Sequence, residues 1–168
     1  MEQKYFNYNL KTHLSKDDYF VGDSNQESYN HLINNNFSKN FFLNGPNKSG
    51  KSHLGLIWKK KFHAISYENN LNQILNKKLN VLVDNFVKNT NEEDVFHIIN
   101  HCNANNLNIL IISSVSLLEY EFKLKDLSSR LKTFTNIKIN LPDDLLLMNL
   151  MIKLLNDKQI IVKNPEIF

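Results

Sequence analysis

The chain has 168 residues, of which 42% are hydrophobic and 22% charged, as in globular proteins of one domain or one domain with a small appendage. The formal net charge of +3 is too small to indicate nucleic-acid binding by itself, and no apolar run approaches the ~20 residues that cross a bilayer. Cys102 is the single cysteine and cannot form an internal disulfide, and the N-terminus lacks a secretory pattern. We therefore expect a cytoplasmic protein with no membrane segment.

Short apolar runs alternate with longer amphipathic segments, which is typical of a parallel α/β fold. The expected strands are Asn40–Leu43, Ala64–Ser66, Val81–Val83, Ile109–Ile112 and Ile137–Ile139. The expected helices between them are Ser52–Phe62, Leu71–Lys78, Glu92–Asn103 and Leu127–Lys132. The runs VLV and ILII are apolar without alternation, as in strands that are covered on both faces. The pattern therefore predicts a three-layer sandwich around a five-stranded parallel sheet.

A second helical element is expected after the last strand. Pro142, Asp143 and Asp144 suit a helix N-terminus, and a strongly apolar segment follows as far as Ile160. We expect three parts: an N-terminal segment 1–18, a nucleotide-binding domain 19–140, and a helical part 141–168 that is short.

One segment matches G-x-x-x-x-G-K-[ST] at every fixed position, between an apolar run and a helix-like stretch. Its residues are Gly45, Pro46, Asn47, Lys48, Ser49, Gly50, Lys51 and Ser52. In such a loop the backbone N–H groups and the helix dipole face a phosphate. Lys51 would reach the β- and γ-phosphates as a catalytic cation, and the Ser52 hydroxyl would bind Mg²⁺. The sequence therefore predicts a P-loop that binds ATP or ADP.

Asp84 ends the apolar run Val81–Val83 and is the predicted magnesium-site and catalytic carboxylate, although a helix cap is an alternative role. Many such ATPases have a second acidic residue directly after it, which polarises the attacking water. Asn85 stands here and cannot accept a proton at neutral pH. We expect nucleotide binding with slow intrinsic hydrolysis.

Two further polar positions are expected at the carboxyl edge of the sheet, where ligands bind in open α/β folds. Ser113 and Ser114 follow the run Ile109–Ile112, so a hydroxyl could lie near the γ-phosphate, or the serines could simply begin a loop. Arg130 is the only arginine in a lysine-rich chain, and it is expected on a short helix at the same edge. A generic positive charge would not require arginine, so Arg130 is a candidate arginine finger for a neighbour's γ-phosphate.

Together these residues resemble the DnaA-related AAA+ family, and within it the short regulators of the Hda type, over nearly the whole chain. The resemblance implies that the segment Phe20–Asn25 lies beside the adenine, with Phe20 and Val21 as its nucleotide-binding residues. It also implies that His53 belongs to the nucleotide site, and that Ser114, or Ser113, is sensor one. It also implies a magnesium role for Asp84 and a finger role for Arg130. Leu141–Ile160 is similar to the start of the family's helical lid, truncated after about one helix.

Regulators of this type bind the sliding clamp through a short N-terminal peptide, and Gln3, Phe6 and Tyr8 are similar to its anchors. The resemblance implies that the chain supplies Arg130 to ATP on a DnaA-type initiator in association with the clamp, promotes hydrolysis and prevents re-initiation. A finger also has a use in a homo-oligomer. No helix-turn-helix domain is visible, so sequence-specific DNA binding is not expected.

Other functions remain open at this stage. A small-molecule kinase would normally close an arginine-rich lid, which one arginine does not provide. A helicase-loader ATPase would need contacts to single-stranded DNA, for which Lys59–Phe62 is a candidate, although lysines also suit a helix C-terminus. A nucleotide-binding scaffold without hydrolysis is consistent with Asn85. His97 and His101 are spaced for one helix face but lack a third ligand, so zinc is not expected.

Overall fold

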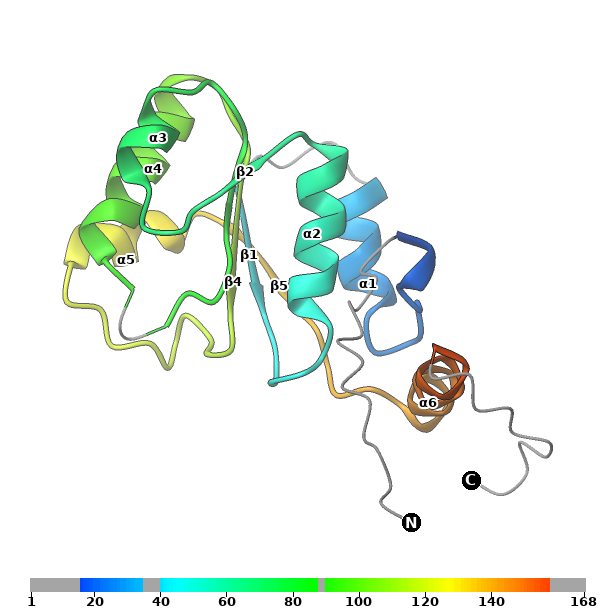
Figure 1. The fold of residues 1–168 in the computed structure, drawn as a ribbon. Helices are drawn as coiled ribbons and strands as arrows, with labels where there is room; N and C mark the ends of the chain where they lie inside the picture. The colour runs from blue at the N-terminus through cyan, green and yellow to red at the C-terminus, as the bar shows by residue number, and fades with distance from the viewer. Residues whose placement is uncertain (1–15, 35–39, 88–89, 158–168) are drawn as a thin grey trace, which may run out of the picture.

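A computed structural model describes residues 16–34, 40–87 and 90–157. At its centre is a parallel sheet of five strands in the order β2-β3-β4-β1-β5 (Figure 1). The strands are β1 (Asn40–Asn44), β2 (Ile65–Ser66), β3 (Val81–Val83), β4 (Ile109–Ser113) and β5 (Thr135–Lys138). The helices are η1 (Lys16–Asp18), α1 (Gln26–Tyr29), η2 (Asn30–Asn34), α2 (Lys51–Lys61), α3 (Leu71–Leu75), α4 (Glu92–Ala104), α5 (Lys125–Leu131) and α6 (Asp144–Asp157).

Two apolar clusters cover the two faces of the sheet, because alternate strand residues point to opposite sides. On one face, α2 and η2 pack on the strand residues Phe41, Leu43 and Leu110. The helices contribute Leu54 and Trp58 from α2 and Leu32 and Ile33 from η2, all of them buried. On the other, α3, α4 and α5 pack on the remaining strand residues. The buried members of that second cluster include Phe42, Val81, Val83, Ile109, Ile111, Ile74, Ile98, Leu127 and Leu131. The predicted three-layer α/β fold is confirmed.

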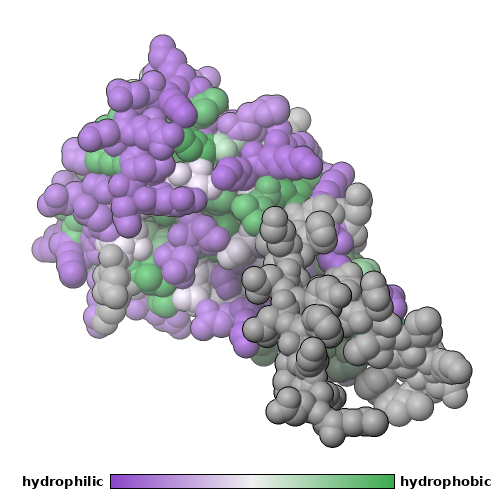
Figure 2. All heavy atoms as spheres, in the orientation of Figure 1, coloured by the Kyte–Doolittle hydropathy of each residue, from purple (hydrophilic) through white to green (hydrophobic). Residues whose placement is uncertain are grey.

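Some predicted boundaries were wrong. The fifth strand is Thr135–Lys138 instead of Ile137–Ile139, since β5 lies at the sheet edge and only Ile137 within it is buried. Helix α3 ends at Leu75 instead of Lys78. The short helices α1 and η2 were not predicted, and they bury Leu32 and Ile33. No helix in the described ranges is long and apolar enough to cross a membrane. On the face of the molecule shown in Figure 2, the surface over α3 and α4 is mostly hydrophilic.

Candidate functional site

The loop between β1 and α2 depends on its two glycines. A Cβ atom at Gly45 would lie 2.5 Å from the backbone oxygen of Ile139, so only glycine lets the loop leave β1 beside the end of β5. Gly50 has a φ of 87°, in the left-handed region, where glycine carries no steric cost. Both glycines of the motif are therefore required by the backbone path, which places the loop at the start of α2.

Lys51 is folded back into this loop. Its side chain is buried, with 8% of the residue exposed, and Nζ donates to the Pro46 carbonyl at 2.5 Å and to Ser49 Oγ at 3.4 Å. Burial lowers the pKa of Lys51, while the negative charge of Asp84 acts in the opposite direction. A buried ammonium whose partners are only neutral oxygens is an anion-binding group, because a phosphate would offset the cost of its burial.

The predicted magnesium residues meet at the carboxyl edge of the sheet. Ser52 Oγ donates to Asp84 Oδ1 at 3.2 Å, and the backbone N–H of Asn85 donates to the same oxygen at 2.8 Å. Both Ser52 and Asp84 are exposed. A hydroxyl and a carboxylate side by side next to a phosphate-binding loop are the donors that Mg²⁺ takes in P-loop sites, so these residues fit that ion.

A cavity of about 130 Å³ lies between the P-loop, residues 18–25 and α6. It is lined by Asp18, Tyr19, Phe20, Ser24, Asn25, Lys48, Ser49, Gly50, His53, Asn140, Pro142, Leu146 and Leu150. Phe20 and His53, both predicted to bind nucleotide, line this cavity, whereas Val21 is 46% exposed and lines a different hollow. The hydroxyl oxygen of Ser24 is buried and has no hydrogen-bond partner among the described residues. A cavity with aromatic and aliphatic walls and an unused polar atom suits a nucleobase or ribose.

Tyr19 lines the cavity but was not predicted from the sequence, whereas Asn25 lines it and belongs to the predicted segment Phe20–Asn25. The Tyr19 ring makes an edge contact with His53, with centroids 5.1 Å apart, and stacks on Tyr29 at 5.8 Å. Asn25 accepts from the Gly22 N–H and donates to the Phe20 carbonyl, both at 2.9 Å. Asn25 therefore holds the turn that places Phe20 in the cavity wall, a role that an asparagine just before a helix could have suggested.

The two serines at the end of β4 differ: Ser113 is its last residue, and Ser114 follows it. Ser113 is buried, and its hydroxyl donates to the Phe86 carbonyl at 2.8 Å and accepts from the Val115 N–H at 3.0 Å. That hydroxyl is therefore committed to the turn after β4. Ser114 is partly exposed beside it, so Ser114 stays the first candidate for the predicted sensor role, as the resemblance implied.

Arg130 does not lie where it was predicted. It stands in the last turn of α5, and the chain then enters β5 at Thr135, which pairs with Phe41 near the start of β1. Because the strands are parallel, that is the amino edge of the sheet, opposite the P-loop. The prediction of a carboxyl-edge position was wrong because α5 belongs to a connection that crosses the sheet from the end of β4 to the start of β5. Arg130 and the P-loop of one chain are therefore separate sites.

Clamp-binding residues were predicted in the N-terminal segment, whereas no site was predicted at His101 or Cys102. Gln3, Phe6 and Tyr8 lie outside the described residues. His101 is engaged through both ring nitrogens, with the Lys77 carbonyl at 3.0 Å and the Asn105 amide at 3.3 Å. Cys102 is fully buried, and burial raises its pKa to about 12, which makes the thiol unreactive.

The fold and the P-loop together define an α/β domain with the AAA+ fold. No model of a known protein family matches the sequence, and no curated protein matches it. Among solved structures, the fold is similar to AMPPCP-bound DnaA from Aquifex aeolicus, with a TM-score of 0.70 and 17% identity over 89% of this chain. Domain III of Thermotoga maritima DnaA gives a TM-score of 0.72, with 18% identity, 90% of this chain and 77% of that one covered. DnaI gives 0.56, with 16% identity and coverage of 79% and 90%.

The chain spans 57% of the length of the Aquifex DnaA structure that it matches. At these identities the comparisons establish a shared fold, that of DnaA and other AAA+ domains.

Proposed function

We propose that this chain is a nucleotide-binding AAA+ regulator of replication initiation, of the Hda type, which promotes ATP hydrolysis by a DnaA-type initiator in association with the sliding clamp. The observation that carries the proposal is the P-loop edge. There a buried lysine, a Ser52–Asp84 pair 3.2 Å apart and a cavity walled by α6 adjoin one another.

ATP or ADP is the ligand that fits this edge. The phosphates would lie on the N–H groups of the P-loop and on Lys51, and Ser52 and Asp84 would hold Mg²⁺, with Asp84 acting through water. Bound Mg²⁺ would neutralise charge on the phosphate oxygens. The base would enter the cavity beside Tyr19 and Phe20. Two DnaA structures with this fold hold AMPPCP, which supports the same ligand class here.

The chain's own hydrolysis is expected to be slow. Asn85 has a φ of 58° and is exposed beside Asp84, yet its amide cannot take a proton from water. A bound nucleotide then serves as a structural switch, and the rate enhancement is directed at a partner's ATP through Arg130. An arginine finger supplied in trans contributes about 10³–10⁵ in rate in comparable NTPases. The separation of Arg130 from the P-loop supports a role in trans.

A helicase-loader ATPase is the second candidate, because the fold also matches DnaI over 90% of that chain. The third is a nucleotide-binding scaffold without hydrolysis, which Asn85 supports. The three differ in what they activate: an initiator, a helicase, or nothing.

The first test is calorimetric titration of the wild-type chain and of Lys51→Ala with ADP and with ATP plus Mg²⁺. Lys60→Ala is the control for removal of a positive charge at an exposed site. Micromolar binding is expected, and no binding by either nucleotide would end the proposal. The second test measures ATP hydrolysis by a DnaA-type initiator on clamp-loaded DNA, with wild-type chain and with Arg130→Ala. We expect stimulation that Arg130→Ala removes. Stimulation of a replicative helicase instead would favour the loader function.

A further inference from the structure

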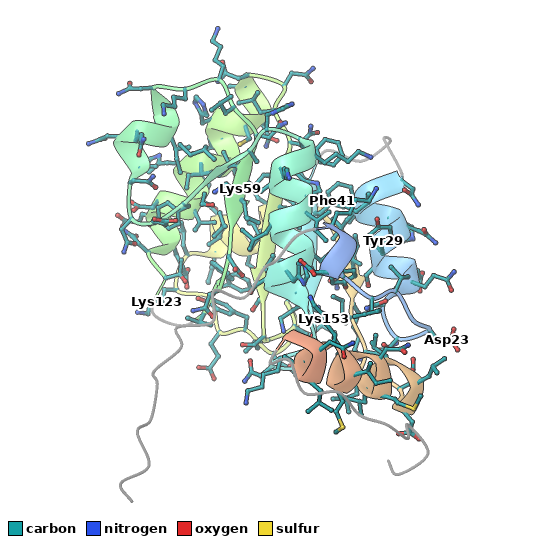
Figure 3. All side chains as sticks on the ribbon, turned by 45° about the vertical axis from the view of Figure 1, so that its right-hand side comes forward. Asp23, Tyr29, Phe41, Lys59, Lys123 and Lys153 are labelled. Atoms are coloured by element: carbon teal, nitrogen blue, oxygen red, sulfur yellow. The ribbon has the colours of Figure 1, made fainter. Side chains whose placement is uncertain are left out.

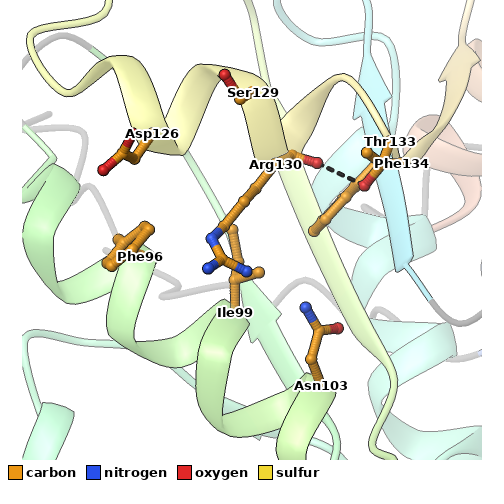
Figure 4. Close-up of a pocket in the computed structure, with 8 residues that line it drawn as sticks. All are labelled: Phe96, Ile99, Asn103, Asp126, Ser129, Arg130, Thr133 and Phe134. Carbon is orange, nitrogen blue, oxygen red and sulfur yellow. Dashed lines mark hydrogen bonds between the residues drawn. The ribbon is translucent and has the colours of Figure 1, made fainter.

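We propose that Phe96 is a positioning residue for Arg130, holding the guanidinium over its ring so that the N–H groups are presented to a phosphate on a partner. This inference rests on the proposed function, and it adds a second residue to the finger. The centre of the guanidinium lies 4.8 Å from the centroid of the Phe96 ring. Figure 4 shows the Arg130 side chain extending from α5 toward α4, between Phe96 and Asn103.

The N–H groups of Arg130 are left available by this arrangement. Among the described residues, no hydrogen bond or ion pair is made by the guanidinium. It borders a hollow of about 390 Å³ that Phe96, Ile99, Asn103, Asp126, Ser129, Thr133 and Phe134 also line. Stacking uses the face of a guanidinium and leaves its in-plane donors free for a bidentate acceptor such as phosphate.

Phe96 is a fixed platform. It is partly buried against the core cluster of that face. It follows the first turn of α4, whose N-terminus is capped by Asn91 Oδ1 accepting from the Glu93 N–H at 3.1 Å. The Phe96 ring packs against the core on one side, and the helix that carries it has a capped N-terminus, so the ring has little freedom to move. A cation that stacks on it therefore loses little further freedom when a partner binds.

The same helix also fixes where α5 begins. Glu92 is buried, and its carboxylate accepts from the backbone N–H groups of Lys123 at 3.2 Å and Leu124 at 2.7 Å. Leu127 and Leu131 then anchor α5 in the core. Through Glu92 and Phe96, α4 therefore sets both the start of α5 and the head of Arg130.

A second cation lies over a ring elsewhere and serves as a control. Lys61 is 5.3 Å from the centroid of Phe62 at the end of α2, and its Nζ also donates to the Ile33 carbonyl. That ammonium already has a partner in the chain, and no finger function is proposed there. Phe62→Leu is thus matched to Phe96→Leu: each removes a partly buried ring beneath a cation.

The stacking can be measured without any partner. The chain has one arginine, so its Nε–H gives one side-chain signal in a ¹H–¹⁵N spectrum, shifted upfield by the ring current of Phe96. Phe96→Leu should move the signal to the position of an unstacked arginine, whereas Phe96→Tyr and Phe62→Leu should not. A signal that is unchanged in Phe96→Leu would overturn the proposal.

The functional test is initiator ATP hydrolysis, with the kcat and KM effects separated. Phe96→Leu and Phe96→Met should lower the stimulated kcat about tenfold, with nucleotide affinity of the chain and its melting midpoint close to wild type. Phe96→Tyr or Phe96→Trp should restore it, which a generic packing role would not predict. If Arg130→Ala abolishes stimulation while Phe96→Leu and Phe96→Met retain it, Phe96 has no positioning role and the proposed function stands. If Arg130→Ala has no effect, the proposed function fails with it.

Discussion

The P-loop edge and the Arg130 face handle positive charge in opposite ways. Lys51 is buried and bonded to oxygens of its own loop. Arg130 is partly exposed beside an aromatic ring, and its guanidinium donates to no residue in the part of the chain that the structure describes. The first arrangement is stable in the absence of a ligand and can exchange its internal acceptors for phosphate. The second has nothing to exchange and gains hydrogen bonds only when another molecule arrives. Under the proposed function, the first site holds its own nucleotide and the second acts on a nucleotide held by a partner.

The largest effect is expected at Lys51. Lys51→Met should weaken nucleotide binding about 100-fold, since charge-assisted hydrogen bonds contribute roughly 1.5–3 kcal/mol each. The ligand-free protein should gain stability, because burial lowers the pKa of Lys51 from 10.5 and so makes the charged form unfavourable in the folded state. That cost is complete below the folded-state pKa and fades as the pH rises toward 10.5. Calorimetric melting at pH 7 should therefore show a higher midpoint than that of the wild-type chain.

The same change at an exposed cation provides the control. Lys60→Met should leave both nucleotide affinity and the melting midpoint near wild type, since Lys60 is exposed. A Lys51→Met protein that melts earlier than wild type would show that the bonds to Pro46 and Ser49 outweigh the cost of burying the ammonium. The contrast with Arg130 would then be weaker.

The second effect concerns the backbone of the P-loop edge. Gly45→Ala should destabilise the fold by about 2 kcal/mol, because its Cβ would lie 2.5 Å from the Ile139 carbonyl, a backbone atom beside the sheet. Gly22→Ala is the matched control, since its Cβ would meet side-chain atoms and no backbone: Asp143 Oδ2 at 3.3 Å and Leu146 Cβ at 3.5 Å. Urea unfolding of both variants measures the difference. Equal midpoints would mean that the loop moves at little cost.

The third effect tests whether the P-loop edge only holds nucleotide. Asn85→Asp should raise intrinsic hydrolysis about tenfold, a modest share of what a positioned base provides, and aspartate tolerates the left-handed backbone found there. Phosphate release at saturating ATP measures the rate, and Asn85→Ser is the control without a base. An unchanged rate would place the limit elsewhere than at Asn85.

The parts of the fold that could be predicted are those with strong local patterns. The apolar run Val81–Val83 is β3 as predicted. The P-loop directly after β1 could be predicted because its glycines and lysine occur at fixed spacing. Asp84 follows directly from the end of β3 and lies beside Ser52. In each case a few adjacent residues determine the outcome.

What could not be predicted depends on contacts between distant segments. Leu32 and Ile33 are buried against α2, but the polar residues around them hide the helical turns from a periodicity argument. The cavity draws its walls from residues 18–25, the P-loop and α6, so no single stretch of sequence indicates it. The edge on which Arg130 lies depends on the path of a connection, which residue spacing does not specify.

The smallest effect is expected where α6 meets η1. Lys153 Nζ lies 2.9 Å from Asp18 Oδ1, with side chains only 21% and 23% exposed, and Figure 3 labels Lys153 on α6. Leu146 and Leu150 of the same helix line the cavity beside the P-loop, so the ion pair holds one wall of that cavity against another. Lys153→Asp should weaken nucleotide binding about threefold, in keeping with the ~1 kcal/mol upper range of such pairs, and less at high salt.

The charge-swapped double variant, Asp18→Lys with Lys153→Asp, decides whether the ion pair itself is responsible. It should recover wild-type affinity in a calorimetric titration with ADP, because the same attraction is rebuilt with its ends exchanged. Glu27→Lys inverts a charge beside His31 on the exposed side of α1, outside the cavity lining, and should change nothing. If the double variant binds as weakly as the single ones, the two side chains act on the cavity separately, and α6 is held over it by apolar contact alone.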